Sequence, residues 1–444
     1  MSNQGNQENQ DKIKVQTKGY KQTEVGVIPE DWKVCSIKDT APLQRGFDLT
    51  NSNLTNGNYP VVYSNGIINY HNKFQVNGPG VVTGRSGTIG KVHFVKDNFW
   101  PHNTSLWVTD FKGNIPLYIY YLYSSLKFKQ FGTGSGVPTL NRNDLHNFKI
   151  PLPPTRTEQT AIATALSDMD SLIECLEKLL VKKRNIKQGA MQELLTGRKR
   201  LNHDSKDLQD SQDFKKSRNQ KNPSKIKVQT TGYKQTEVGV IPEDWDVLLL
   251  NNIGDFYKGR NIPRAELTDE GVSCVLYGEI YTKYNFVAHL LKSKTSIKIA
   301  KESFEIKRGD LLFAGSGETA EDIGKCFSYM GDEYAVAGGD IVVLRPKDIF
   351  NSCFLGYILN TSDSANQKYY MGQGSSVYHI YSSNLKKLKI PLPPTHTEQT
   401  AIATALSDMD TEIEQLETKL SKYKMLKTGM MQELLTGKKR LNHD

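Results

Sequence analysis

The sequence predicts an α+β protein built as a pseudo-twofold tandem repeat, in which two mixed α/β domains alternate with two long helices that pair with each other. Three observations predict this class. Two segments of the 444-residue chain occur twice almost unchanged, the segments between them are dissimilar and rich in strand and turn patterns, and each repeat ends in a long heptad pattern. Internal repeats dictate the architecture, so they are considered first.

The first repeated segment is KIKVQTKGYKQTEVGVIPEDWKV, residues 12–34, which returns at residues 225–247 with two changes in 23 positions. A longer block, residues 149–204, returns at residues 389–444 with about three quarters of its positions identical. The inserts that these frames enclose barely align and differ in length by 27 residues. The chain therefore repeats one scaffold around two different inserts.

The predicted order of segments follows directly: a disordered N-terminus (1–11), the repeated segment (12–34), the first insert (35–148), a helical block (149–204), a linker (205–224), the repeated segment again (225–247), the second insert (248–388) and the second helical block (389–444). The linker is polar and charged throughout, so it cannot bury a core of its own.

The start of each helix can be predicted from the sequence. Thr155 to Glu158 and Thr395 to Glu398 fit the S/T-x-x-E capping box directly after the sequence PLPP. Gly197 and Gly437 stand where such helices end. Apolar residues then follow steps of three and four, at Ile162, Leu166, Met169, Ile173, Leu176 and Leu180 and at Ile402, Leu406, Met409, Ile413, Leu416 and Leu420.

About 40 residues of helix span roughly 60 Å, which is too long for the stripe to be buried on one small domain. The nearest matching stripe belongs to the other copy. We therefore expect the two helices to pair with each other, although packing of each helix onto its own domain remains the alternative.

The two inserts read as mixtures of strands, turns and helices. Residues 78–100 and 308–330 alternate apolar runs with Gly and Ser turns, and residues 115–131 are apolar and aromatic enough for a helix. The Gly-rich loops GRSGTIGK, residues 84–91, and GSGETAEDIGK, residues 315–325, share a pattern although their surroundings do not.

Composition and motifs exclude several classes of protein. The net charge of +9 suits a polyanionic partner, no apolar run of about 18 residues is present, and residues 1–11 are polar, so we expect a cytoplasmic protein. The scattered cysteines and histidines show no zinc spacing, so no metal site is predicted. GRSGTIGK has five residues between its outer glycines and no hydroxyl after the lysine, so it is not a P-loop. No catalytic residue is predicted, since methyltransferase, nuclease and helicase motifs are missing from the sequence.

The inserts do carry loop side chains that suit DNA. Arginine and lysine suit guanine edges and phosphates, asparagine and glutamine suit adenine, and glutamate can accept a hydrogen bond from cytosine. Any one of them can equally be a solvated turn residue, so only the set is informative. The candidate DNA contacts are Arg45, Ser64, Asn65, Arg85, Ser86, Thr88, Lys91, Asn103, Thr104 and Ser135 in the first insert, and Lys258, Arg260, Tyr277, Glu279, Ser316, Glu318, Lys325, Gln373, Ser375, Ser376 and Tyr378 in the second.

With both copies laid out, the chain resembles the specificity subunit of type I restriction-modification systems. The resemblance rests on GYKQTEVGVIPEDW at the start of each half, on KIPLPPTxTEQTAIATALSDMD, and on QELLTGRKRL and QELLTGKKRL. It implies two target-recognition domains that each read one half of a split DNA site, held by an antiparallel coiled coil that docks two modification subunits and the restriction subunits. It further implies that S-adenosylmethionine, ATP and magnesium are used by those partners, with no cofactor in this chain.

This resemblance agrees with the repeat. Two copies of one scaffold can present equivalent faces to two identical partners, while unlike inserts read unlike half-sites. Two alternatives remain: a coiled-coil adaptor whose inserts bind protein, and a fused methyltransferase with an unrecognised motif.

Overall fold

The computed structural model describes residues 19–133, 138–201, 232–260, 262–374 and 377–441, which form two compact units. Unit 1 comprises the chain up to Lys178 together with the segment from Glu417 onward, and unit 2 comprises Leu179–Leu416. The predicted disordered N-terminus (1–11) and the predicted linker (205–224) lie outside the described residues. Each unit therefore combines its own insert with helical segments from both repeats.

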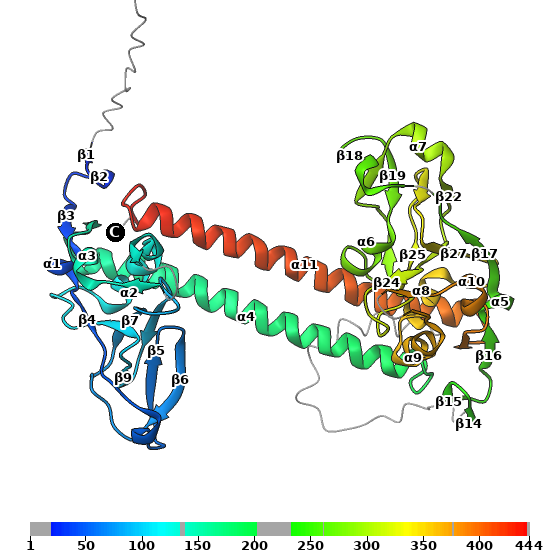
Figure 1. Cartoon of the computed structure of the whole chain (residues 1–444), viewed down its shortest axis with the longest axis horizontal. Coiled ribbons are helices and arrows are strands. Elements are labelled where there is room, and N and C mark those ends of the chain that lie inside the picture. Colours follow the sequence, from blue (N-terminus) through cyan, green and yellow to red (C-terminus); the bar gives the residue numbers. More distant parts are fainter. Residues whose placement is uncertain (1–18, 134–137, 202–231, 261, 375–376, 442–444) are drawn as a thin grey trace, which may run out of the picture. The chain divides into compact units, whose positions relative to one another are not determined.

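Unit 1 is a mixed α/β domain (Figure 1), and its larger sheets have four and three strands. The order of the four-stranded sheet is β4-β10-β7-β8, and that of the three-stranded sheet is β6-β5-β9. The strands are β1 (Tyr20–Thr23), β2 (Gly26–Pro29), β3 (Lys33–Ser36), β4 (Leu43–Arg45), β5 (Tyr59–Tyr63), β6 (Gly66–His71), β7 (Gly80–Gly84), β8 (Val92–Val95), β9 (Trp100–Pro101), β10 (Ser105–Val108), β11 (Gly132–Thr133), β12 (Thr139–Leu140) and β13 (Lys149–Leu152). The helices are α1 (Ile37–Thr40), α2 (Pro116–Ser125), α3 (Arg142–His146) and the start of α4 (Arg156–Leu194), with 3-10 turns at Asn51–Asn53 and Phe128–Phe131.

Unit 2 is built on two five-stranded sheets, ordered β17-β27-β23-β25-β20 and β18-β21-β19-β26-β22. Its strands are β14 (Tyr233–Thr236), β15 (Gly239–Pro242), β16 (Asp246–Leu249), β17 (Gly254–Lys258), β18 (Leu267–Thr268), β19 (Val272–Val275), β20 (Val287–Ala288), β21 (Ser293–Thr295), β22 (Phe304–Ile306), β23 (Leu311–Ala314), β24 (Ser316–Gly317), β25 (Cys326–Tyr329), β26 (Ala335–Ala337), β27 (Ile341–Pro346), β28 (Tyr378–His379) and β29 (Lys389–Leu392). The helices are α5 (Leu250–Ile253), α6 (Tyr277–Thr282), α7 (Ile297–Glu302), α8 (Ser352–Ile358), α9 (Ser362–Met371), α10 (Ser382–Leu385) and the start of α11 (His396–Leu434), with a 3-10 turn at Arg264–Glu266.

The frame closes each insert in the same way. In unit 1, β3 pairs antiparallel with β13, and in unit 2, β16 pairs antiparallel with β29. The first and last strands around each insert are therefore neighbours. The chain enters and leaves the insert at one place, from which a long helix begins.

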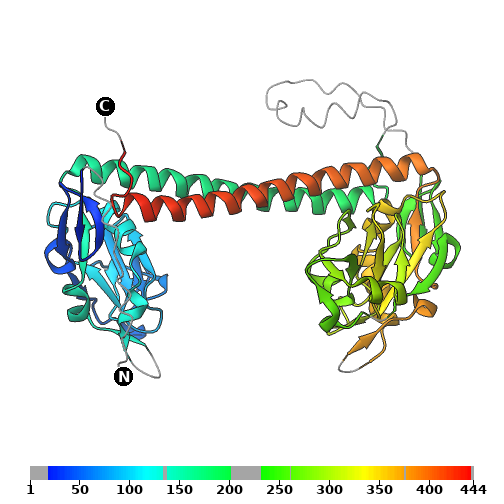
Figure 2. The same cartoon turned by 90° about the horizontal axis from the view of Figure 1, so that it is seen from above.

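The long helices α4 and α11 run side by side within each unit, as Figure 2 shows. In unit 1, Lys427 pairs with Asp170 at the short end of the hydrogen-bond range and Lys424 pairs with Glu177 at 2.6 Å. Partner numbers on α11 fall as those on α4 rise, so this pairing is antiparallel. The predicted α+β class with an antiparallel helix pair is confirmed.

The predicted apolar stripe lies on the less exposed side of both helices. Ile162, Leu166, Leu176 and Leu180 are buried, as are Ile402 and Leu406, and the remaining stripe residues are half-buried at Met169, Ile173, Met409, Ile413, Leu416 and Leu420. Burial is deepest near each helix start, because there the helix also packs on its own insert. The alternative considered above, packing on the helix's own domain, thus coexists with pairing.

Matching triads anchor the helices to the inserts. The Tyr121 hydroxyl donates to Asp170 Oδ2 (2.8 Å), and Lys427 of the paired helix binds the same carboxylate. In unit 2, the Tyr357 hydroxyl donates to Asp410 Oδ2 (2.7 Å), which also binds Lys187. One aspartate of the repeated sequence SDMD thus joins an insert and both helices in each unit.

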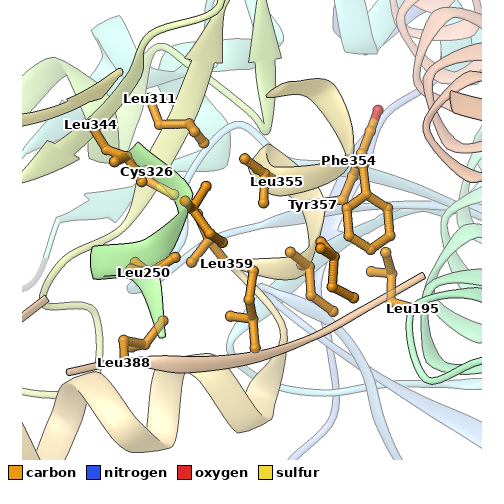
Figure 3. Packing of buried hydrophobic residues seen from close by; sticks show 14 of the residues in the cluster. Leu195, Leu250, Leu311, Cys326, Leu344, Phe354, Leu355, Tyr357, Leu359 and Leu388 are labelled. Atoms are coloured by element: carbon orange, nitrogen blue, oxygen red, sulfur yellow. The ribbon is translucent and has the colours of Figure 1, made fainter. Parts of the chain in front are cut away.

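The end of each long helix docks on the repeated segment of the other half. Gly437, with φ of 71°, packs against Pro29 and Trp32 in unit 1, and Gly197, with φ of 68°, packs against Pro242 and Trp245 in unit 2. The glycines take the left-handed conformation that ends helices. The core of unit 2 accordingly includes Leu195 from the end of α4 among residues of α8 (Figure 3).

Candidate nucleic-acid interface

The two inserts share one strand framework despite their dissimilar sequences. The order β4-β10-β7-β8 in unit 1 matches β17-β27-β23-β25 in unit 2, and every neighbouring pair is antiparallel. In each unit a parallel pair adjoins it, β5 with β9 and β19 with β26.

Six backbone hydrogen bonds at one end of this framework recur in both units. In unit 1 they run from Gly46 N to Ser105 O, Phe47 N to Pro101 O, His102 N to Val62 O, Gly84 N to Lys91 O, Arg85 N to Thr104 O and Leu140 N to Arg85 O, at 2.7–3.3 Å. Their counterparts in unit 2 run from Gly259 N to Ile341 O, Arg260 N to Ala337 O, Gly338 N to Val275 O, Ala314 N to Lys325 O, Gly315 N to Asp340 O and Ile380 N to Gly315 O, at 2.7–3.1 Å. These bonds define equivalent positions that sequence comparison of the inserts does not reveal.

A glycine is required at one point of the framework. A Cβ on Gly46 would lie 2.2 Å from His102 O, and a Cβ on Gly259 would lie 1.9 Å from Gly338 O. Both glycines stand twelve residues after the end of their repeated segment. This constant offset was the sequence signal that could have found them.

Several predicted DNA contacts fall at equivalent positions at this end. The pairs are Arg45 with Lys258, Ser64 with Tyr277, Ser86 with Ser316, and Lys91 with Lys325. The pairs come from three places: the end of β4 or β17, the segment directly after β5 or β19, and the Gly-rich loop after β7 or β23, which holds two of them. The structure thus brings the chosen loops together within each unit.

In unit 1 the predicted side chains differ in their exposure and in whether they are already bound to another residue. Asn65, Thr88 and Lys91 are exposed, Arg85 and Ser86 are half-buried, and Ser64 is buried. Arg45 pairs with Asp48 (2.8 Å), and Asn103 donates to the same carboxylate. Both partners of the Arg45 pair are exposed, so a phosphate can displace Asp48 at a cost of about 1 kcal/mol or less.

The two lysines that end the Gly-rich loops make the same kind of contact. Lys91 Nζ donates to Asn65 O (3.1 Å), and Lys325 Nζ donates to Tyr281 O (3.1 Å). Burial lowers the pKa of Lys325. Each lysine therefore links its loop to the segment that follows β5 or β19.

In unit 2, Lys258, Arg260, Tyr277, Glu318 and Gln373 are exposed and Tyr378 is half-buried. The buried Ser316 hydroxyl lies 2.9 Å from His379 Nδ1, so it holds the loop together.

Glu279 is placed differently from the prediction. Its carboxylate is buried and binds Lys283 (2.6 Å), Ser293 and the backbone N–H of Leu276 (3.0 Å). These bonds cap α6 from inside the domain, so the carboxylate is not available to a cytosine. We assign Glu279 a structural role. Ser135, Ser375 and Ser376 lie outside the described residues.

The structure adds residues that the sequence did not single out. The His102 ring lies 4.2 Å from the Tyr63 ring between centroids, tilted by 33°, and its Nδ1 lies 3.0 Å from Thr104 Oγ1. Burial lowers the pKa of His102. His379 stacks on the exposed Tyr381 at 6.3 Å. Neither histidine belongs to a recognisable motif, so the sequence carried no signal for them.

The first N–H groups of the Gly-rich loop of unit 1 are bound within the protein. The N–H groups of Arg85 and Ser86 both donate to Thr104 O (2.9 and 3.1 Å), and that of Gly87 donates to Pro138 O (3.2 Å). These three N–H groups are therefore not available to a phosphate. Within the described residues, histidine, cysteine and carboxylate side chains form no cluster of three or more suited to a metal. No helix of the described part is long and apolar enough to cross a bilayer.

Comparison with known proteins gives concordant results. The sequence matches the family described as type I restriction modification DNA specificity domain over residues 29–182 and 242–422. A putative type I restriction enzyme MjaX specificity subunit of Methanocaldococcus jannaschii is 26% identical over 461 residues, covering 95% of this chain and 97% of that protein. The MjaVIII specificity subunit of the same organism is 28% identical over 338 residues, covering 73% of this chain and 71% of that protein.

Among solved structures, the type I restriction-modification S subunit of M. genitalium has a TM-score of 0.59 at 15% identity. The match covers 91% of this chain and 96% of that one. It shows that the fold is shared.

Proposed function

We propose that this chain, which belongs to the type I restriction modification DNA specificity family, reads a bipartite DNA target, one half with each unit. The observation that carries the proposal is the recurrent framework of six backbone hydrogen bonds in two dissimilar inserts. A common scaffold that presents different side chains at equivalent positions is what two half-sites of different sequence require.

The proposed contacts divide into two classes. Arg45 and Lys258 stand at equivalent, exposed positions and carry the same charge, which suits phosphates whatever the base sequence. Phe47 and Arg260 stand at equivalent positions and differ in chemistry, which suits readout of different bases. Arg85 has Gly315 as its counterpart, so its contact belongs to the first half-site alone.

The remaining functions of the complex are assigned to partners. We propose that two modification subunits dock on the paired helices and their frames, and that restriction subunits join them in the cytoplasm. S-adenosylmethionine, ATP and magnesium would be held by those partners, and this chain would be non-catalytic. The adaptor alternative, without sequence-specific DNA binding, finds no support in the family membership.

An insert exchange tests the proposal. Residues 35–148 are replaced by the corresponding insert of another family member, and methylated motifs are mapped across the genome of a host expressing the complex. The expected result is a bipartite motif in which one half changes and the other stays. A change in both halves, or methylation without a bipartite motif, would contradict independent reading.

A further inference from the structure

A surface groove of about 530 Å³ lies in unit 2 where the frame meets the insert. The strands β16 and β29 contribute Leu248 and Leu392 to it, and the turn before α8 contributes Ile349 and Phe350. Ile349 is 66% exposed. Asp246, Asp348, Pro393, Pro394, His396 and Gln399 complete the lining. The groove thus has an apolar floor and rim with two carboxylates.

These carboxylates have no partner among the described residues of unit 2. Asp246 and Asp348 are exposed, and no hydrogen bond or ion pair of the described residues involves their side chains. Unpaired carboxylates beside apolar surface suit a lysine or arginine, whose apolar stem packs while its charged head stays at the edge.

The groove includes two of the few differences between those parts of the frames that border the inserts. Residues 12–34 and 149–170 differ from residues 225–247 and 389–410 at three positions only. One of these, Lys18 against Thr231, lies outside the described residues. The other two are Lys33 against Asp246 and Arg156 against His396, and both second-copy residues line the groove.

The insert contributes a third position at which a basic residue in unit 1 corresponds to an acidic residue in unit 2. Gln159 Oε1 accepts from Ile115 N and Gln399 Oε1 accepts from Asn351 N, both at 2.9 Å, so these two backbone positions are equivalent. Counting back three residues from Ile115 and from Asn351 makes Lys112 and Asp348 equivalent. Counting back two residues makes Gly113 and Ile349 equivalent.

The charge of the two sites is therefore opposite. In unit 1 the equivalent residues are Lys33, Lys112 and Arg156, and within the described part of the chain only Lys112 is paired with a neighbouring carboxylate, that of Asp110 (2.9 Å), so that site keeps a net positive charge. Asp246 and Asp348 make the site in unit 2 negative. In unit 1 Arg156 reaches across to Gly113 O, at the position that Ile349 occupies in unit 2. Two identical partners need identical surfaces, so a site with opposite charge distinguishes one copy from the other.

We propose that this groove binds a cationic peptide segment of a protein subunit of the type I complex, with one Lys or Arg beside an apolar residue, and that the counterpart in unit 1 does not. The inference rests on the docking of partner subunits proposed above. The carboxylates repel DNA phosphates, so nucleic acid is not the occupant.

The test uses the complex reconstituted from this chain and its modification and restriction subunits. The variant Asp246→Lys/His396→Arg gives the second frame the residues of the first, and Ile349→Gly copies Gly113. The exposed Asp269→Lys makes the same charge change elsewhere on unit 2 and serves as control. Subunit affinity and stoichiometry are measured by native mass spectrometry across salt concentrations.

The double variant should weaken one subunit copy about tenfold and reduce the salt dependence of its binding, while Asp269→Lys should not. Ile349→Gly should weaken the same copy without changing the salt dependence. Unchanged affinity of every subunit in both groove variants would overturn the proposal.

A photo-crosslinking residue at position 349 provides an independent readout. It should capture one protein subunit of the complex at a segment that contains lysine or arginine, and capture of DNA or of a segment without either would overturn the proposal. The methylated motif should stay bipartite and unchanged in all variants. Loss of a bipartite motif in the unmodified complex would instead refute the proposed function, so the two failures are distinguishable.

Discussion

Removal of the Arg440 guanidinium should loosen the junction that closes unit 1. Arg440 donates from Nε and Nη2 to the two oxygens of Glu158, at 2.8 and 2.9 Å, and also binds Asp31 at 3.0 Å. The Trp32 indole N–H donates to the same glutamate (3.3 Å). The last segment of the chain is thereby tied to the start of α4 and to the first repeated segment.

The expected loss follows from the exposure of the two partners. The Glu158 side chain is 5% exposed, and stranding a fully buried carboxylate costs about 3–5 kcal/mol. The Arg440 side chain is 40% exposed, so water replaces part of what the guanidinium supplied, and Trp32 remains as a donor. We therefore expect Arg440→Met to cost about 2 kcal/mol. For a unit of about 200 residues this corresponds to a fall in Tm of about 4–8 °C.

The assay is thermal and urea unfolding of the chain, with hydrogen exchange of residues 436–441 as a local readout. Lys178→Met is the control, because the side chains of Lys178 and its partner Glu174 are 75% and 66% exposed and such surface pairs contribute little to stability. The double variant Glu158→Gln/Arg440→Met should recover part of the loss, since no buried charge is left. A loss for Arg440→Met no larger than that of the control would refute the reasoning.

Three further outcomes are expected. Gly46→Ala and Gly259→Ala should each abolish methylation of targets by disrupting one framework, because the new Cβ would meet a backbone oxygen at about 2 Å. Gly278→Ala should be tolerated, because the space around Gly278 is open. Equal tolerance of all three variants would contradict the role of the framework. Arg85→Ala should either relax one position of one half-site, at about 1–3 kcal/mol, or lower the salt slope of DNA binding by about one. Lys325→Met should leave the salt slope unchanged, because the Lys325 ammonium is bound to Tyr281 O. A lowered slope in Lys325→Met with no effect of Arg85→Ala would assign the DNA contact to Lys325 instead of Arg85. Burial lowers the pKa of His93, so as pH falls the unfolded chain takes up this proton before the folded chain does, and stability should be lost below pH about 6.5. Urea unfolding at pH 7.5 and 5.5 should show a smaller loss of stability in His93→Gln than in the unmodified chain. An equal loss in both proteins would exclude His93 as a cause of the pH dependence.

The repeated parts of the fold could be predicted from the sequence because their signals are local. The capping boxes at Thr155 and Thr395 precede helices that begin at Arg156 and His396, and Gly197 and Gly437 take the left-handed conformation expected after a helix. The predicted helix at residues 115–131 is α2, although it ends at Ser125. Leu126 takes extended backbone there, and Phe128 turns into the core.

The candidate site was less accessible to sequence reasoning. Residue type suggested candidates such as Arg45 and Lys258, which the fold places at the ends of β4 and β17 rather than in loops, but composition could not reveal what each side chain already binds. Glu279 shows the difference, because a Glu after a Gly in a predicted loop looks free, whereas in the fold it meets Lys283 and Ser293. Long-range partners of this kind depend on tertiary packing, which periodicity does not encode.

The framework also explains how inserts of different length fit one frame. Ser64 and Arg85 are separated by 21 positions, whereas their equivalents Tyr277 and Gly315 are separated by 38, so 17 of the 27 extra residues lie there. That stretch contains α6, α7 and the strands β20–β22, which lie outside the common strand order except where β20 adds an edge to it. From His102 to Ile115 and from Gly338 to Asn351 the spacing is identical, and this segment leads into the helix that packs on the frame. Most of the variation in length therefore lies in one stretch of the insert, whereas the segment that leads to the frame keeps its length, which favours exchange of one insert without disturbing the frame.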